Sequence, residues 1–246
     1  MTSSYLFENI QILEGSRSSL KKETVLIKDG VIKAFGEKAL QKAEFLEMKP
    51  QKAKNMLLAP CLVDPHSFLE SPFSGKEENI YTLIKKATYA GYGQLGILPR
   101  SNLWRDQIET INSLKAIKSE VLIHLWGGFS LGGKGISLSK HADLLRNGAI
   151  GLADDDFFPP IELLKQGFLL GEMKKSPILV APRDKSLQAG GMSRQSVEAL
   201  RAGWPTDPIE SEILPLAQVL ELHKQYPEIA LRLMNISTSE GISILK

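Results

Sequence analysis

The chain has 246 residues, of which 43% are hydrophobic and 24% are charged, so long disordered stretches are excluded. Its 30 basic residues are almost balanced by 28 acidic residues, which leaves a net charge of +2. Because nucleic-acid-binding proteins usually carry a basic excess or a basic stripe, this balance argues against a nucleic-acid partner.

The cysteine content and the apolar runs predict a cytoplasmic protein. Cys61 is the single cysteine, which excludes an internal disulfide and a thiolate zinc cage. No apolar run approaches the roughly 18 residues that cross a bilayer, so we expect no membrane contact. The opening residues, MTSSYLFENIQIL, place no positive charge ahead of an apolar segment and do not predict a secretory signal.

Residues 1–58 are predicted to form a small β subdomain. The stretches 5–13 and 24–27 favour strands, and Val31 to Phe35 would be the returning strand of a hairpin. The dipeptide Asp29-Gly30 lies between the second and third strands. It predicts a tight turn, because glycine tolerates the positive φ that such a turn requires.

Residues 59–246 are predicted to form a separate α/β domain, in which strand-like runs alternate with helical stretches. The predicted strands are 57–63, 95–98, 121–126, 149–153, 178–181 and 229–234, and the main helices are 80–89, 104–118, 140–146 and 209–225. A stretch at 190–208 rich in Gly, Pro, Ser and Thr is predicted to be a long loop. The alternation favours a parallel sheet that is buried on both faces. It leaves the open doubly wound sheet and the (β/α) barrel as alternatives.

The segment from Asp64 through His66 to Phe68 carries the clearest chemical signal. It ends a predicted strand, and active sites of α/β proteins lie at the carboxyl ends of strands. The segment resembles the opening of an amidohydrolase barrel of the dihydroorotase type, in which a strand ends in Asp-x-His-x-His. Alternate side chains of a strand point the same way, so those two histidines share a metal ion. Phe68 stands at the position of the second histidine.

The resemblance continues in order along nearly the whole chain. Asp154, in an acidic run after the fourth predicted strand, matches the carboxylate that bridges two metals in one bacterial class. Ala181 and Asn235 stand where the family has histidines after its fifth and sixth strands, and Arg100 replaces an asparagine that would hold substrate. Among the ligand positions that can be placed, His66 and Asp154 alone keep a competent side chain.

The resemblance implies a TIM-like (β/α) barrel of the metal-dependent amidohydrolase type. The family barrel has about eight strands, and we count six, so we expect an incomplete barrel behind the small β subdomain. Family chemistry uses a metal-bound water whose pKa falls from about 15.7 towards roughly 7. Zinc needs about three or four ligands, so His66 and Asp154 would be vestigial ligands that hold zinc weakly. No residue is assigned a catalytic role.

Simpler interpretations compete with these assignments. His66 could cap a strand end by binding a carbonyl, and Asp154 could belong to a solvated turn. The glycine-rich stretch from Gly128 to Gly135 nearly matches a phosphate-binding loop, but Gly135 stands where that motif requires a hydroxyl. We therefore do not predict nucleotide binding.

Two functional hypotheses follow from the resemblance. The first is a catalytically inactive dihydroorotase homologue that acts as a structural partner, as some family members without metal ligands do for aspartate transcarbamoylase, or that self-associates. The second is an active cyclic-amide hydrolase that interconverts carbamoyl-aspartate and dihydroorotate through a reduced site at His66 and Asp154. Fold resemblance cannot choose between them, because function depends on the site.

Overall fold

The structure, a computed structural model, describes residues 4–15, 20–154, 156 and 158–246. The chain divides into two compact units, Met1–Cys61 and Leu62–Lys246. The first unit contains a small sheet, and the second contains a larger parallel sheet with helices, as the sequence predicts. No helix within the described ranges is long and apolar enough to span a bilayer.

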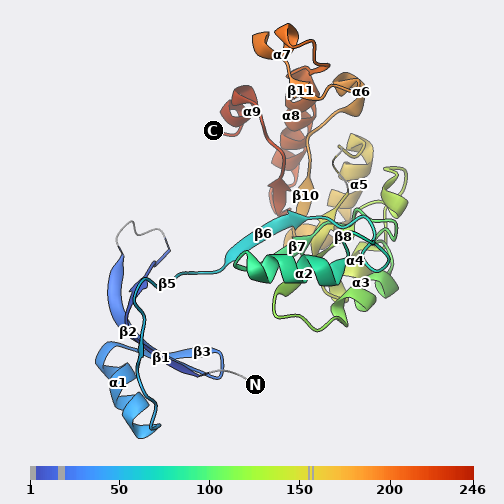
Figure 1. The fold of residues 1–246 in the computed structure, drawn as a ribbon. Helices are drawn as coiled ribbons and strands as arrows, with labels where there is room; N and C mark the ends of the chain where they lie inside the picture. Colours follow the sequence, from blue (N-terminus) through green and yellow to red (C-terminus); the bar gives the residue numbers. More distant parts are fainter. Residues whose placement is uncertain (1–3, 16–19, 155, 157) are drawn as a thin grey trace. The chain divides into compact units, whose positions relative to one another are not determined.

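The first unit is built on a sheet of five strands, drawn in blue in Figure 1. The strands are β1 (Tyr5–Ile12), β2 (Lys21–Lys28), β3 (Val31–Phe35), β4 (Gln51–Lys52) and β5 (Leu57–Leu58). β1, β2 and β3 pair antiparallel, and β4 and β5 both pair with β1 in parallel. The turn at Asp29-Gly30 is confirmed, because Lys28 pairs with Val31 and both turn residues have positive φ.

The small β subdomain also contains a helix that the sequence did not predict. Gly36–Phe45 forms helix α1. Ala39 and Ala43 lie one helical turn apart and pack against Leu6 and Leu26 of the sheet. The segment consists largely of good helix formers, and this apolar stripe gives the helix a buried face.

The second unit is built on six parallel strands: β6 (Leu62–Ser67), β7 (Tyr92–Ile97), β8 (Leu122–Gly128), β9 (Ala149–Ala153), β10 (Ile178–Val180) and β13 (Leu231–Leu233). Their order in the sheet is β13-β10-β9-β8-β7-β6, so successive strands are neighbours throughout. This is the order of a barrel, whereas a doubly wound sheet reverses direction at its centre. The sheet ends at β6 and β13, and the barrel is incomplete, as predicted. One predicted strand, 57–63, is instead divided between β5 and β6.

Both faces of this sheet are apolar. Leu125 of β8 and Ile178 of β10 lie in a large cluster that also holds helical side chains, whereas the adjacent Trp126 and Leu179 lie in a second, smaller cluster. This alternation follows from the two-residue period of a strand. The helices that contribute to the large cluster are α2 (Ile80–Tyr89), α3 (Ile108–Lys115), α4 (His141–Arg146), α5 (Ile161–Leu170) and α8 (Glu210–Gln225).

The predicted loop at 190–208 contains regular structure. Figure 1 shows it gathered at one end of α8. Its elements are β11 (Ser193–Arg194), α7 (Val197–Arg201) and β12 (Thr206–Asp207), which follow helix α6 (Lys185–Gln188). Strands β11 and β12 pair in parallel. Short turns η1 (Leu131–Gly133) and η2 (Glu172–Lys174) and the final helix α9 (Ser239–Ile244) complete the unit.

The glycine-rich stretch after β8 packs against an indole ring. A Cβ at Gly128 would lie 2.4 Å from Nε1 of Trp104, and one at Gly133 would lie 2.5 Å from another atom of the same ring. Trp104 Nε1 also donates a hydrogen bond to the Ser130 carbonyl at 3.1 Å. Close packing therefore accounts for these two glycines without a bound phosphate.

Arg105 joins the carboxyl ends of β7 and β8 from inside the protein. The residue is 1% exposed, and its Nη1 atom donates to the carbonyls of Ile97, Leu98 and Trp126 at 2.8, 2.9 and 3.0 Å. Burial lowers the pKa of Arg105 to about 10, so the guanidinium stays charged at neutral pH. It therefore holds the edge at which the strands end.

The variant Arg105→Met should destabilise the fold. The substituted side chain would keep an apolar stem of similar length but would leave three buried carbonyls without their donor. Hydrogen bonds from a charged group contribute about 1.5–3 kcal/mol each, and the burial of the cation offsets part of this. We therefore expect the free energy of unfolding to fall by about 2–4 kcal/mol in chemical denaturation.

The matched control is Arg146→Met, which removes an exposed guanidinium that lies 3.8 Å from Asp143. Exposed ion pairs contribute little, so this variant should unfold at nearly the wild-type denaturant concentration. Equal stability of the Arg105 variant and the wild type would contradict the role assigned to the buried guanidinium.

Candidate functional site

A small pocket lies at the carboxyl ends of the parallel strands, the edge at which α/β proteins bind ligands. Its volume is about 190 Å³. The side chains around it come from β6 and from the segments that follow β6, β7, β9 and β13. They are His66, Phe68, Leu98, Arg100, Asp156, Met234 and Asn235.

His66 lies near the carboxyl end of β6, where the sequence predicts it. Its ring centroid is 6.3 Å from that of Trp126, whose Nε1 donates to the carbonyl of Pro65 at 3.2 Å. Burial lowers the pKa of His66, Asp64 opposes this shift, and Arg232 adds to it. The imidazole is therefore neutral at neutral pH, which is the form that can bind a metal or accept a proton.

Phe68 and Arg100 form a contact on one side of the pocket. The Arg100 guanidinium carbon lies 4.7 Å from the centroid of the Phe68 ring, a distance at which the cation and the ring attract each other. Phe68 stands where the resemblance predicts the second histidine, and its ring contacts the Arg100 guanidinium instead of a metal ion. Arg100 follows β7, as the sequence predicts, and its charge lies at the pocket.

Asp156 bridges the segments that follow β9, β10 and β13. Its Oδ2 accepts a hydrogen bond from Nη1 of Arg183 at 3.0 Å, and its Oδ1 accepts one from the side-chain amide of Asn235. Asn235 has a φ of 62°, a left-handed conformation that asparagine tolerates better than most residues. Sequence reasoning assigned no role to Asp156 or Arg183, although the acidic run after β9 drew attention to the region.

Asp154 is not one of the side chains that line the pocket. It is 3% exposed, and its two carboxylate oxygens accept hydrogen bonds from the backbone N–H and the hydroxyl of Ser130 at 2.8 and 2.6 Å. The structure thus joins this carboxylate, which follows β9, to the segment after β8, and it does not bring Asp154 into the pocket with His66. Asp155, the next acid in the run, lies outside the described residues. The assignment of His66 and Asp154 as vestigial ligands stays a prediction.

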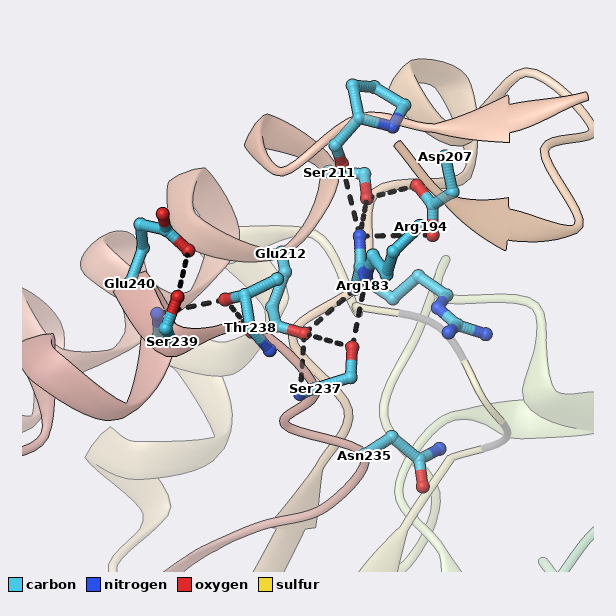
Figure 2. Close-up of polar contacts among 12 residues, drawn as sticks. Arg183, Arg194, Asp207, Ser211, Glu212, Asn235, Ser237, Thr238, Ser239 and Glu240 are labelled. Carbon is cyan, nitrogen blue, oxygen red and sulfur yellow. Dashed lines mark hydrogen bonds and ion pairs between the residues drawn. The ribbon is translucent and has the colours of Figure 1, made fainter. Parts of the chain in front are cut away.

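A buried carboxylate at the start of α8 holds the segment that carries Asn235. Glu212 is 0% exposed, and its Oε2 accepts hydrogen bonds from the N–H and hydroxyl of Ser237 at 2.9 and 2.8 Å. Its Oε1 accepts the N–H of Thr238 at 3.1 Å and also the Thr238 hydroxyl. Figure 2 shows these contacts beside Arg194, whose Nη2 lies 2.8 Å from Oε2 of Glu212.

Arg194 extends this network to β12. Its Nη1 lies 3.1 Å from Oδ2 of Asp207 and donates to the hydroxyl of Ser211 at 2.9 Å, while its Nε donates to the Ser237 hydroxyl at 3.0 Å. Burial raises the pKa of Glu212, but the hydrogen bonds from Thr238 and Ser237 outweigh burial, and the net pKa is lowered. Glu212 is therefore ionised at neutral pH and is fully paired, so this cluster, which the sequence did not reveal, is structural.

Comparison with known proteins shows that the sequence is similar to dihydroorotases. No protein-family profile matches the chain. It is 28% identical over 216 residues to a "probable dihydroorotase-like protein" of Synechocystis sp., covering 78% of this chain and 49% of that protein. It is 26% identical over 247 aligned positions to a dihydroorotase of Thermoanaerobacter sp., covering 98% of this chain and 56% of that enzyme.

Solved structures agree on the fold. An L-hydantoinase (dihydropyrimidinase) from Arthrobacter aurescens superimposes with a TM-score of 0.71 at 15% identity, covering 98% of this chain and 54% of that one. A solved enamidase of the amidohydrolase superfamily gives a TM-score of 0.54 at 14% identity, covering 76% of this chain and 52% of its own. The chain is dihydroorotase-like. It spans about half the length of the curated relatives that it matches.

The side chains of this dihydroorotase-like chain do not fit the zinc that the resemblance implies. Within the described ranges, no three or more His, Cys, Asp or Glu side chains are grouped so that they could hold a metal ion. Ala181 lies in the small apolar cluster with Leu179 and Met234 and offers a methyl group. Phe68 offers a ring, and Asn235 directs its amide N–H at Asp156. Among the side chains that the structure describes, an ion at His66 would therefore lack the three or four ligands that zinc requires.

The variant Glu212→Gln should destabilise the fold. Replacing Glu212 with glutamine keeps its size but removes the charge and replaces one acceptor oxygen with an amide donor. Arg194 would then lose the charge with which it pairs, and either Ser237 or Thr238 would lose its hydrogen-bond acceptor. We expect the free energy of unfolding to fall by about 1.5–3 kcal/mol, the contribution of a hydrogen bond to a charged group.

The control is Glu240→Gln, which changes an exposed carboxylate that is hydrogen-bonded to the neighbouring Ser239. Chemical denaturation of both variants should show a large loss of stability at position 212 and almost none at position 240. If the two variants were equally stable, the network would not hold the segment that carries Asn235.

Proposed function

We propose that this chain is a catalytically inactive relative of dihydroorotase that acts in the cytoplasm as a structural partner of another protein, with aspartate transcarbamoylase as the first candidate. One observation supports the loss of catalysis above all. Asn235, which stands at a histidine position of the family, donates its amide hydrogen to Asp156. The amide nitrogen that donates this bond cannot coordinate a cation, the amide oxygen of Asn235 is a poorer zinc ligand than imidazole, and Asp156 is held by Arg183 as well.

The other polar groups near the strand ends have partners of their own. Arg100 contacts the ring of Phe68, and both oxygens of Asp154 are bound by Ser130. We therefore expect zinc to bind weakly at His66. Any second or third ligand from this edge of the sheet would first have to leave its present partner. A fold without the family's chemistry suits a scaffold role, in which the surface carries the function.

The alternative is an active hydrolase of cyclic amides with a reduced site. The observation that favours it is the lowered pKa of His66, which keeps the imidazole neutral and able to act as a ligand or base. Asp154 would supply the second group, although it does not line the pocket. An active hydrolase requires bound metal and measurable turnover. Assays of metal content and turnover therefore separate it from a structural partner.

The proposed function predicts that purified protein will not interconvert carbamoyl-aspartate and dihydroorotate above the rate in buffer, with or without added zinc. It also predicts that the chain will elute together with the aspartate transcarbamoylase of the same organism in gel filtration. An active dihydroorotase run in parallel controls the assay, and each protein run alone controls the elution positions.

Each part of the proposal can fail separately. Turnover by the purified chain, lost in the variant His66→Ala, would establish the hydrolase alternative. Independent migration of the two proteins would contradict the partnership with aspartate transcarbamoylase. Elution of this chain by itself as a dimer would favour self-association instead.

A further inference from the structure

A groove lined mainly by apolar surface runs beside helix α2, with a volume of about 650 Å³. One wall is a face of the helix, which carries Tyr81, Lys85 and Tyr89 at spacings of four residues. The other wall is the turn at 118–120, which leads into β8 at its amino end. The groove therefore lies at the opposite end of the strands from the His66 pocket and shares no residue with it.

The aromatic side chains of this groove are unusually open to solvent. Tyr81 is 63% exposed and Tyr89 is 96% exposed, and neither ring stacks on another aromatic ring within the described residues. Ile84 lies between them and packs partly against the core. An isolated exposed tyrosine is ordinary, but two that flank one apolar groove are typical of a surface that binds another protein.

The charges of the groove identify the kind of partner. Three lysines, Lys85, Lys86 and Lys118, line it, against one acid, Glu120. Lys86 forms an exposed ion pair with Glu78 at 3.2 Å, whereas Lys85 and Lys118 form no ion pair with a described residue. The two walls therefore present a positive field to an entering segment, which carboxylates would complement.

We propose that this groove binds an acidic segment of a partner protein. An apolar side chain of that segment inserts between Tyr81 and Tyr89, and its carboxylates lie beside Lys85 and Lys118. The tyrosines and lysines that line the groove suit such a segment, because the apolar contact supplies affinity and the charges supply selectivity. The proposal holds whether or not the distant pocket catalyses a reaction.

Fluorescence anisotropy of a labelled peptide of alternating glutamate and phenylalanine tests this directly on the full chain. We expect saturable binding that weakens with added salt, since exposed charge pairs are screened. The variants Tyr89→Ala and Lys118→Glu should each weaken binding by about tenfold or more, in line with the loss of a contact residue or the reversal of a charge. Both side chains are exposed, so neither change should affect folding.

The matched controls are Trp204→Ala and Lys165→Glu, an exposed aromatic residue and an exposed lysine of the same unit that do not line the groove. Both should bind the peptide as wild type does. A peptide with lysine in place of glutamate should not bind. Failure of the acidic peptide to saturate the wild type, or equal binding by the groove variants and the controls, would overturn the proposal.

Two further results would assign the groove to another occupant and would equally overturn it. In one, Tyr89→Ala converts a wild-type dimer to a monomer in sedimentation, which would make the occupant a second copy of this chain. In the other, a labelled single-stranded oligonucleotide competes the peptide off and binds more tightly than the peptide does.

Discussion

The buried carboxylate of Glu212 fixes the position of the segment after β13, which forms one wall of the pocket. It is completely enclosed and accepts hydrogen bonds from both Ser237 and Thr238, while Arg194 balances its charge. A buried ion is tolerated only when its partners are complete. The segment after β13 is therefore fixed in place, and Asn235, two residues before Ser237, is fixed with it. Its left-handed backbone and its contact with Asp156 are consistent with this fixed position.

The same edge of the sheet is held from the opposite side by a buried cation. Arg105 binds carbonyls at the ends of β7 and β8, and Trp126, whose carbonyl it contacts, lies in the apolar cluster next to His66. The scaffold of an amidohydrolase-like barrel is thus kept rigid at the place where such barrels carry chemistry. Phe68, Asn235 and Asp154 stand at positions that the resemblance assigns to metal ligands, and they contact Arg100, Asp156 and Ser130 instead. This pairing supports the structural role that we propose for the chain.

Local patterns in the sequence predicted the features that depend on local physics. Asp29-Gly30 predicted the hairpin, because a tight turn requires positive φ. The alternation of strands and helices predicted the parallel sheet. His66 could be placed at a strand end because Asp-Pro-His terminates an apolar run. Helix α1 was missed, because its stripe of two alanines is too weakly apolar to stand out from a segment bounded by strands.

The partners of polar side chains could not be predicted, because they lie far apart in the chain. Asp156 contacts Asn235 across 79 positions, and Glu212 reaches Thr238 across 26. The spacing of residues along the chain does not indicate such a pairing. The family resemblance instead identified Asp154, in the same acidic run, as the candidate metal ligand. Asp154 instead binds Ser130, 24 positions away, which the local sequence could not indicate.

Measurement of the zinc content of the purified chain tests whether these side chains can still hold a catalytic metal ion. Protein equilibrated with excess zinc, dialysed and analysed by mass spectrometry should retain much less than one zinc ion per chain. A variant that carries Phe68→His, Ala181→His and Asn235→His together should retain more, because imidazole is a far better zinc ligand than the groups it replaces. Stoichiometric zinc in the wild-type chain, lost in His66→Ala, would contradict the account.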